Sequence, residues 1–294
     1  MTTADAAALS LAIEQLLVAR NPRGMAGVRR ALEPGYCLRA ARLMDDCVAQ
    51  RGEVLIATGF PVGDTFETDG PVGAISLYRA LDQLGARPTL VCGDPLAAQL
   101  SAEYRVLALD HVDTLEEREA QTQATLEQLQ PALILAIERP GQAADGDYYN
   151  MRGETIGANV VCFDTFFRQT RCPTIAIGDG GNELGMGKVA DALRGLDIVP
   201  AETACDELIV ADVSNWGGHA LVALLGWLRG VDLLADFDNQ KILRYLSEHG
   251  SVDGVTRRDE LTEDGLPGEE GAALVVQLRR LTGFLPPATA APQA

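Results

Sequence analysis

The segment GDGGNELGMGK, residues 178–188, has the residue types for metal or anion chemistry. Asp179 and Glu183 follow a strand-like run, and their carboxylates could point at one spot and hold a hard divalent cation such as Mg²⁺ or Mn²⁺. Backbone N–H groups at 180–183 would form a site for an anion or an oxyanion. The alternative is a tight strand-to-helix turn whose acids complement a helix N-terminus. A plain turn needs one or two glycines rather than five, so we favour a functional site. The other candidate binding residues of this segment are Gly180, Gly181, Asn182 and Lys188.

Three known motifs can be compared with this segment. The phosphate-binding P-loop does not fit, because Asn182 replaces its first glycine and Val189 its Ser/Thr. The dinucleotide fingerprint fits only from Gly185 onward, too far beyond the strand, so no nucleotide cofactor is expected. The metal-binding loop of haloacid-dehalogenase-like phosphatases is similar, with Glu183 in its last position. Such enzymes need a nucleophilic Asp on the first strand, which here ends in Thr58-Gly-Phe-Pro. A Mg²⁺-dependent phosphatase is therefore only an alternative.

A second polar segment is ERPGQAADGDYYNMRGE, residues 138–154. Its two arginines suit a carboxylate substrate, because a planar guanidinium can donate two parallel hydrogen bonds. Its first glutamate is a candidate base and its first tyrosine a candidate acid. The alternative is a solvated loop with a surface ion pair. The candidate residues of this segment are Glu138, Arg139, Tyr148, Asn150 and Arg152.

A long strand-to-helix connection, GFPVGDTFETDGPVGA at residues 59–74, contains two more acids. Glu67 is a candidate base. Asp69 is either a carboxylate that binds substrate or metal, or the cap of a helix that begins at Pro71.

The segment VSNWGGHALVALL, residues 213–225, opens another predicted helix. Asn215 either caps this helix or contacts substrate, and Trp216 beside two glycines is interpreted as the wall of a small pocket. His219 lies in an apolar stretch, which is typical of a core histidine. The three histidines of the chain form no Ser-His-Asp or Cys-His arrangement, which argues against a nucleophilic hydrolase.

Short apolar runs alternate with helical patterns along the chain, and these elements must position the polar segments. The predicted strands are 53–58, 88–92, 105–109, 132–137, 173–177 and 207–211, and the predicted helices lie near 72–84, 95–102, 114–129, 153–169, 182–194 and 217–229. The strands are apolar throughout, as in a sheet covered on both faces. This alternation predicts an α/β fold with a doubly wound, mostly parallel sheet, Rossmann-like and three-layered. Ligands bind beyond the carboxyl ends of such strands, where all four polar segments fall, so we expect one shared cavity.

No linker or internal repeat divides the chain, so we expect one α/β domain. Its predicted parts are the domain 1–284 with its core at about 53–229, an N-terminal helix at 5–20, C-terminal helices at about 239–282, and a flexible tail at 285–294.

The chain is strongly acidic, with 42 acidic and 24 basic residues and a net charge of −18. This charge disfavours nucleic acid and anionic membranes as partners, and an anionic substrate would need a local cation or metal. No apolar run approaches the roughly 20 residues that span a bilayer. The six cysteines form no Cys-x-x-Cys pair, and the N-terminus has no basic targeting region. We therefore expect a cytoplasmic protein.

Four motifs in this order, ETDGPVGA, ERPGQAADGDYYNMRG, GDGGNELGMGK and VSNWGG, resemble the C-terminal domain of D-glutamate cyclases over roughly residues 55–225. The resemblance implies a carbon–oxygen lyase that converts D-glutamate reversibly to 5-oxo-D-proline and water. The substrate would be a small amino dicarboxylate or its lactam. Fuller members of the family carry an additional N-terminal domain. We therefore expect a stand-alone chain that forms a homo-oligomer or works with a separate N-terminal-domain partner. A non-catalytic module that binds an amino acid or lactam is the alternative.

The implied reaction needs a free amine held against the side-chain carboxylate. A carboxylate is a poor electrophile until a cation neutralises it. A divalent ion on Asp179 and Glu183, or Lys188 with Arg139, would do so. The amides at 180–183 would then hold the tetrahedral oxyanion.

Overall fold

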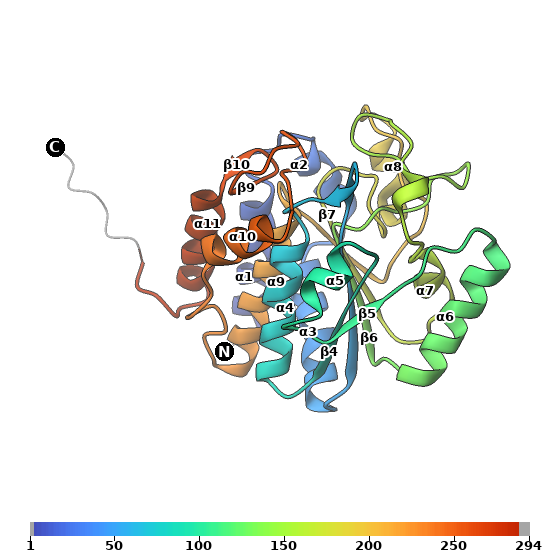
Figure 1. Ribbon diagram of the computed structural model, residues 1–294. Coiled ribbons are helices and arrows are strands. Elements are labelled where there is room, and N and C mark those ends of the chain that lie inside the picture. The colour runs from blue at the N-terminus through green and yellow to red at the C-terminus, as the bar shows by residue number, and fades with distance from the viewer. Residues whose placement is uncertain (1–2, 288–294) are drawn as a thin grey trace.

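Six short strands form one parallel sheet at the centre of the computed structural model, which describes residues 3–287 of the chain (Figure 1). These strands are β1 (Glu53–Ala57), β4 (Arg87–Cys92), β5 (Val106–Ala108), β6 (Leu133–Ile137), β7 (Thr174–Gly178) and β8 (Glu207–Val210). Their order across the sheet is β5-β4-β1-β6-β7-β8, so the chain first builds outward from β1 on one side and then on the other. This is the order of a doubly wound sheet, and the predicted fold class is confirmed.

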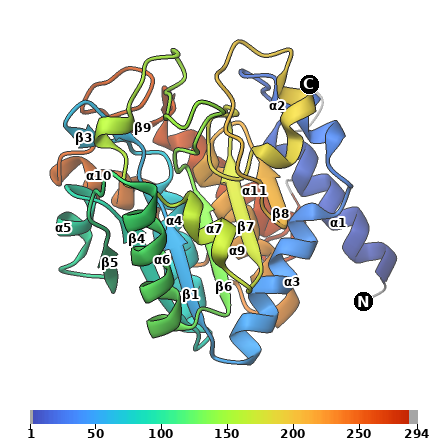
Figure 2. The same ribbon diagram turned by 90° about the vertical axis from the view of Figure 1, so that its right-hand side faces the viewer.

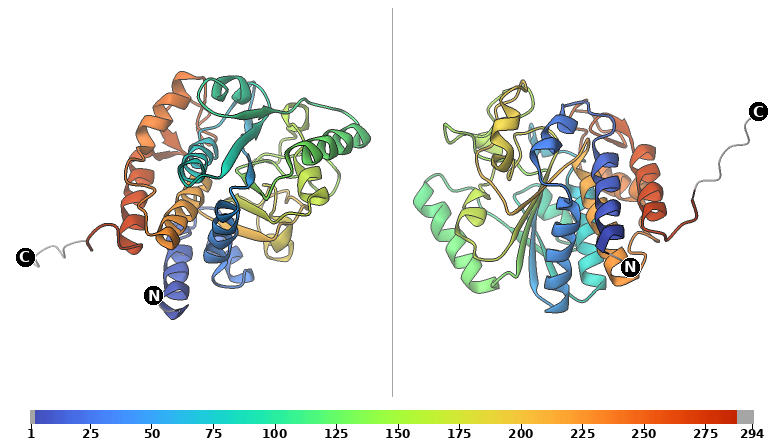
Figure 3. Two further views of the ribbon diagram at one scale, coloured as in Figure 1. Left: turned by 90° about the horizontal axis from the view of Figure 1, so that it is seen from below. Right: turned by 180° about the vertical axis from the view of Figure 1, so that it is seen from behind.

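Alternate residues of β1, β4 and β6 face two separate hydrophobic cores. In β1, Val54 and Ile56 belong to the larger core, whereas Leu55 and Ala57 belong to the smaller one. Helices cover both faces, which gives three layers (Figure 3), and Figure 2 shows α6 and α7 in front of the sheet. The larger core contains residues of α1 (Thr3–Leu17), α2 (Met25–Val28), α3 (Tyr36–Ala49), α4 (Pro71–Gln83), α5 (Leu96–Leu100), α8 (Ala190–Leu193), α9 (Ser214–Arg229), α10 (Asn239–Glu248) and α11 (Gly268–Leu281). The smaller core is covered by α6 (Leu115–Leu129) and α7 (Asp164–Gln169).

Several helices begin at the signals that the sequence carries. Thr114 and Glu117 form a reciprocal capping box at the start of α6. Asp238 accepts a hydrogen bond from the backbone of α10, and Pro71 occupies the first turn of α4. Among residues 3–287, no helix is long and apolar enough to cross a bilayer.

The helix predicted at 153–169 is wrong over its first half. Asn150 Oδ1 accepts hydrogen bonds from the backbone N–H groups of Arg152 and Glu154, so this stretch is a tight turn. A short 3₁₀ helix follows at Gly157–Asn159, and only Asp164–Gln169 is α-helical.

The helix predicted at 182–194 is also wrong over its first half. Gly181 and Gly185 have φ angles of 113° and 102°, which a right-handed helix does not contain. A Cβ on Gly185 would lie 2.1 Å from the Cβ of Ala176 in β7, so this loop packs directly on the sheet. Helical structure begins only at Gly187–Val189 and continues through Ala190–Leu193.

Some elements were not predicted at all. Helix α3 packs against β8 and α9, and two small hairpins lie over the sheet edge that carries the polar loops. The hairpins are β2–β3 (Pro61–Val62 and Thr65–Phe66) and β9–β10 (Thr262–Glu263 and Leu266–Pro267). Helix α1 ends at Leu17, three residues before the predicted end at 20. The predicted flexible tail lies outside the described residues from 288 onward.

Candidate functional site

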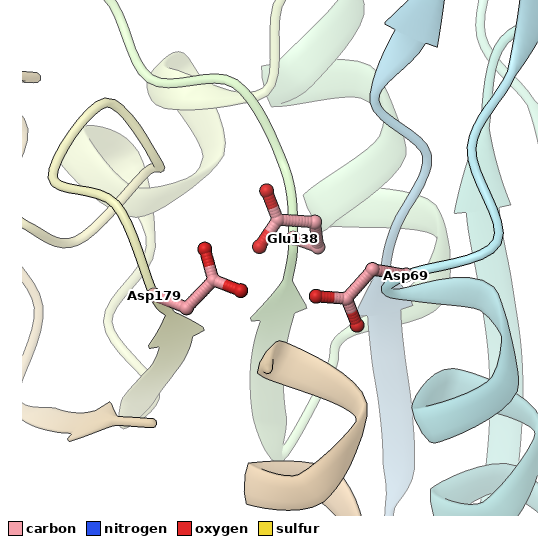
Figure 4. Close-up of side chains that lie close together, drawn as sticks. All are labelled: Asp69, Glu138 and Asp179. Atoms are coloured by element: carbon pink, nitrogen blue, oxygen red, sulfur yellow. The ribbon is translucent and has the colours of Figure 1, made fainter. Parts of the chain in front are cut away.

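Three carboxylates face one another above the carboxyl ends of the central strands (Figure 4). Glu138 directly follows β6, Asp179 directly follows β7, and Asp69 precedes α4 in the connection after β1. Each offers one oxygen to a group whose atoms all lie within 4.8 Å of one another. These residues form the acid cluster, and each is at least nine-tenths buried. The cluster lies where β1 and β6 are neighbours, which is the point where the strand order reverses and where doubly wound folds bind ligands.

The acid cluster is electrostatically unfavourable by itself. Burial, together with the nearby charge of Asp264, raises the pKa of Asp69 to about 7. Burial, with Glu183 and Glu67 nearby, raises the pKa of Glu138 well above its usual range. Burial also raises the pKa of Asp179 well above its usual range, and the nearby Arg23 guanidinium offsets only part of this increase. Carboxylates this close and this dry need protons or a cation to neutralise them.

The oxygens of the acid cluster fit a hard divalent cation. Asp179 Oδ2 is buried and has no hydrogen-bond partner among residues 3–287. Glu138 Oε2 accepts a hydrogen bond from Ser214 Oγ at 2.5 Å, and the three carboxylates together supply the oxygen ligands that Mg²⁺ and Mn²⁺ prefer. The unpartnered oxygen is the observation that favours a cation here over a purely structural cluster.

Two helix N-termini hold Asp69 in place. Its carboxylate accepts hydrogen bonds from the backbone N–H groups of Ser214 (2.8 Å) and Asn215 (2.7 Å) at the start of α9. The Asn215 side chain accepts hydrogen bonds from Gly70 N (2.8 Å) and Gly73 N (2.7 Å) at the start of α4. A Cβ on Gly73 would lie 3.0 Å from the Asn215 Cα, so this close approach of α4 to α9 requires glycine. Asp69 and Asn215 are both caps, and Asp69 belongs to the acid cluster as well.

Glu183 does not take the position predicted for it. Its carboxylate accepts hydrogen bonds from the backbone N–H groups of Gly180 and Gly181, both at 2.7 Å, and from Asp179 N at 3.3 Å. The expected anion site on these amides is therefore filled by a side chain of the same loop. We expected Glu183 beside Asp179, but Asp69 and Glu138 lie there. Glu183 instead stabilises the conformation of the loop through its backbone hydrogen bonds.

A cavity of about 290 Å³ opens beside the acid cluster. Its volume lies just below the range of roughly 300–1,000 Å³ typical of small-molecule sites. Loops after β1, β6 and β7 line it, together with the chain between α10 and β10. The predicted site residues that line it are Glu67, Glu138, Asn150, Arg152, Asp179, Gly180, Asn182 and Glu183.

Arg139 and Tyr148 lie outside this cavity. The Arg139 guanidinium is buried and donates hydrogen bonds to the carbonyls of Thr58 and Gly59, both at 3.2 Å, and to that of Val161. It therefore ties three loops together, and the structure does not place it for substrate binding. The buried Tyr148 hydroxyl donates to Asp164 Oδ2 at 3.0 Å, so it is engaged within the protein as well.

Lys188 and Trp216, which were predicted to bind substrate, also lie outside the cavity. Lys188 Nζ donates to the carbonyls of Cys205 (3.3 Å) and Asp206 (2.6 Å), at the far side of the loop. Trp216 is buried in the larger core, with the Arg20 guanidinium 5.8 Å from its ring centroid. Neither residue lines the cavity of the acid cluster.

Arg23 and Asp264 are among the cavity residues that were not predicted from the sequence. Arg23 Nη1 donates to Asp179 Oδ1 at 2.6 Å and also to Asp264 Oδ2. Burial alone would lower the pKa of Arg23, but the charges of Asp179 and Asp264 raise it above its usual value. Both residues lie in turns that the sequence signals, Asn21-Pro-Arg-Gly24 and Asp264-Gly265, but nothing in those turns points to Asp179.

The fold and the site together define a doubly wound α/β protein with a buried acid cluster and a small-molecule cavity at the switch point of its sheet. The family model described as D-glutamate cyclase-like, C-terminal, matches residues 13–279, so the chain belongs to this family. Human mitochondrial D-glutamate cyclase is 35% identical over 205 residues, which cover 58% of this chain and 32% of that protein. The chain therefore spans about a third of the length of this relative.

Two solved structures that resemble this chain have much lower sequence identity. An exopolyphosphatase-related protein from Bacteroides fragilis has 10% identity and a TM-score of 0.37, covering 84% of this chain and 61% of that chain. RecJ from Thermus thermophilus, solved in complex with Mn²⁺, has 14% identity and a TM-score of 0.37, covering 85% of this chain and 38% of that chain.

Proposed function

We propose that this chain is a lyase of the D-glutamate cyclase type, which interconverts D-glutamate and 5-oxo-D-proline plus water. Membership of the D-glutamate cyclase-like family supports the reaction class. The observation that carries the proposal is the acid cluster beside a cavity of about 290 Å³, because it joins a cation-binding set of oxygens to a space for one small molecule.

We further propose that Asp69, Glu138 and Asp179 hold one Mg²⁺ or Mn²⁺. A divalent ion there would draw charge from a substrate carboxylate and make it a better electrophile. The chain itself supplies the rigidity of this site, because Asp69 is fixed by α9 and the loop of Asp179 is fixed by Glu183.

Glu67 is our candidate for the group that takes the proton from the substrate amine. It lines the cavity, is 7% exposed, and lies outside the acid cluster. A buried carboxylate beside a cavity is well placed to accept a proton, provided that the amine lies within hydrogen-bond reach. Asn150 and Asn182 add amide groups to the wall, and the enclosed volume favours the folded substrate conformation in which amine and carboxylate meet.

The cellular setting is also a proposal. All six cysteines are free thiols in the structure, which fits a reducing compartment such as the cytoplasm. A homo-oligomer or a separate N-terminal-domain partner would complete the assembly, and the ligand is a small amino dicarboxylate or its lactam.

Proton NMR of the purified chain tests the reaction directly. D-glutamate, L-glutamate and 5-oxoproline would each be incubated with the protein, with and without Mn²⁺ or Mg²⁺. We expect D-glutamate and 5-oxo-D-proline to interconvert only when the metal is present. Binding of either compound without any conversion, seen as a rise in Tm with unchanged spectra, would overturn the lyase and favour a binding module.

A further inference from the structure

Two arginines lie on different turns that meet at the wall of the cavity. Arg152 Nη2 donates to the carbonyl of Val255 at 2.9 Å, and Arg257 Nη2 donates to Glu154 Oε2 at 2.6 Å. Each guanidinium thus reaches the turn that carries the other, and both arginines line the cavity. The contact pairs a segment that follows β6 with a segment that follows α10, about a hundred residues later in the chain.

Both turns are fixed by their own side chains. Asn150 Oδ1 accepts two backbone hydrogen bonds within the first turn, at 2.9 and 3.1 Å. Asp253 Oδ1 accepts two within the second, at 2.9 and 2.7 Å, and this carboxylate is fully buried. The guanidiniums are therefore presented from backbone that is already ordered, which lowers the entropic cost of binding a ligand.

The backbone of Arg257 is in the left-handed region, with a φ of 57°. Glycine suits this region better than arginine, so folding alone gives no reason for arginine here. Two other residues of the cavity wall share this conformation, Glu138 at 42° and Asp264 at 56°. Residues held in such conformations concentrate at functional sites, which indicates that the side chain of Arg257 is what the position requires.

The charges around the cavity indicate that these two arginines are the cations available to a ligand carboxylate. The wall contains Glu67, Glu138 and Asp179, and the whole chain has a net charge of −18, so a ligand carboxylate needs a cation. Arg23 is already held between the carboxylates of Asp179 and Asp264. Arg257 pairs only with the exposed Glu154 among the described residues, at side-chain exposures of 46% and 55%. Exposed ion pairs are weak, so a ligand carboxylate can replace Glu154 at little cost.

We propose that Arg152 and Arg257 form a carboxylate-binding pair, which makes the cavity selective for a dicarboxylate. One ligand carboxylate lies toward the acid cluster, where the proposed divalent ion would neutralise it, and the other lies on the two guanidiniums. Glu154 occupies Arg257 when the cavity is empty and is displaced on binding. The choice of D-glutamate as the natural ligand rests on the proposed function, whereas the recognition of a dicarboxylate does not.

Calorimetric titration with glutarate in the presence of Mn²⁺ tests this pair, because glutarate has two carboxylates but no amine and therefore cannot form a lactam. Arg257→Gly removes the guanidinium and relaxes the backbone, so we expect Kd to rise about 10- to 100-fold while Tm does not fall. Glu154→Gln frees Arg257 and should lower Kd. Arg258→Ala is the matched control, since Arg258 is exposed and lies outside the cavity wall, and it should leave Kd unchanged.

Three results would overturn the proposal that Arg152 and Arg257 bind a carboxylate. The two arginines do not recognise a carboxylate if the wild-type protein fails to bind glutarate. The same conclusion follows if Arg257→Gly binds glutarate as tightly as the wild type. Weaker binding by Glu154→Gln, in parallel with Arg257→Gly, would mean that the ion pair only joins two turns. If Arg257→Gly does not fold, the direction of the Glu154→Gln effect decides the question. Binding that depends on Arg257 without turnover of D-glutamate would defeat the proposed function and leave this inference standing.

Discussion

Asp69 and Asn215 cap each other's helices. The Asp69 carboxylate accepts the backbone N–H of Asn215 at 2.7 Å, and the Asn215 side chain accepts the N–H groups of Gly70 and Gly73 at the start of the helix that follows Asp69. The N-termini of α4 and α9 therefore meet beside the acid cluster, and their positive ends partly offset its charge. One of the three clustered acids is thus a helix cap and a candidate metal ligand at once.

Asn215→Asp tests the contact of the Asn215 amide nitrogen, because an aspartate can still accept the two hydrogen bonds that cap α4. Asn215 Nδ2 donates to Glu263 Oε1 at 2.8 Å, so an aspartate would lose this bond and place a second carboxylate against a buried glutamate. We expect the free energy of unfolding to fall by about 2–4 kcal/mol, measured by urea denaturation. Asn159→Asp, whose side-chain bond to Gly63 is exposed, is the control and should change little. Equal stability of the two variants would show that the hydrogen bond from Asn215 to Glu263 does not stabilise the fold.

Glu138→Gln separates metal binding from folding. Within residues 3–287, the side chain of Glu138 accepts a hydrogen bond from Ser214 Oγ, and glutamine can still accept it. Because the change removes one of several crowded buried charges, we expect Tm without metal to rise. Wild type should gain about 2.7 kcal/mol from Mn²⁺ at a hundred times its Kd, and the variant should lose most of this gain. Asp191→Asn, on the surface, is the control. A variant that keeps the full Mn²⁺ shift would exclude Glu138 as a ligand.

Glu183→Gln tests whether Glu183 shapes the loop. Glutamine keeps the size of the side chain but turns one acceptor into a donor, which leaves a backbone N–H of Gly180 or Gly181 unpaired. A buried unpaired donor costs about 1–3 kcal/mol, and we expect a loss of this size in chemical denaturation. The exposed Glu269→Gln is the comparison. Unchanged stability together with lost Mn²⁺ binding would instead restore Glu183 as a metal ligand.

His219 predicts a pH dependence of stability. Burial lowers its pKa to about 4, from about 6.5 in an unfolded chain. Between these values the unfolded chain binds the proton and the folded protein does not, so this contribution is complete above pH 6.5 and is lost as the pH falls to 4. His219→Gln keeps a donor for Asn239 Oδ1 but does not titrate. Relative to the variant, wild type should lose about 3 kcal/mol between pH 7 and pH 4 in urea denaturation. Parallel pH profiles would show that His219 is not buried neutral.

The sheet could be predicted because its strands carry a strong local signal. Each is a short apolar run bounded by turn residues, and all six predicted strands are present, although the third is shorter than expected. Glu138 and Asp179 were found for the same reason, since a polar residue directly after a buried strand lies at its carboxyl end.

The rest of the site depends on contacts that sequence patterns do not contain. Arg23 and Asp264 are 241 residues apart and meet because the turn between α1 and α2 contacts the turn of the β9–β10 hairpin. Arg139 has the same side chain as a substrate-binding arginine, but both of its terminal nitrogens donate to backbone carbonyls. Composition indicates which donors exist, whereas packing decides which of them remain free for a ligand.

The position of Arg23 in the sequence limits how this protein can be divided into fragments. The family motifs extend from about residue 55 to residue 225. Arg23, which pairs with Asp179, lies before this stretch, and Asp264, which also pairs with Arg23, lies after it. A fragment cut to the motifs would keep all three clustered acids and lose their internal counter-charge. Such a fragment would carry the signature of the family and lack the arginine that offsets the charge of its buried carboxylates.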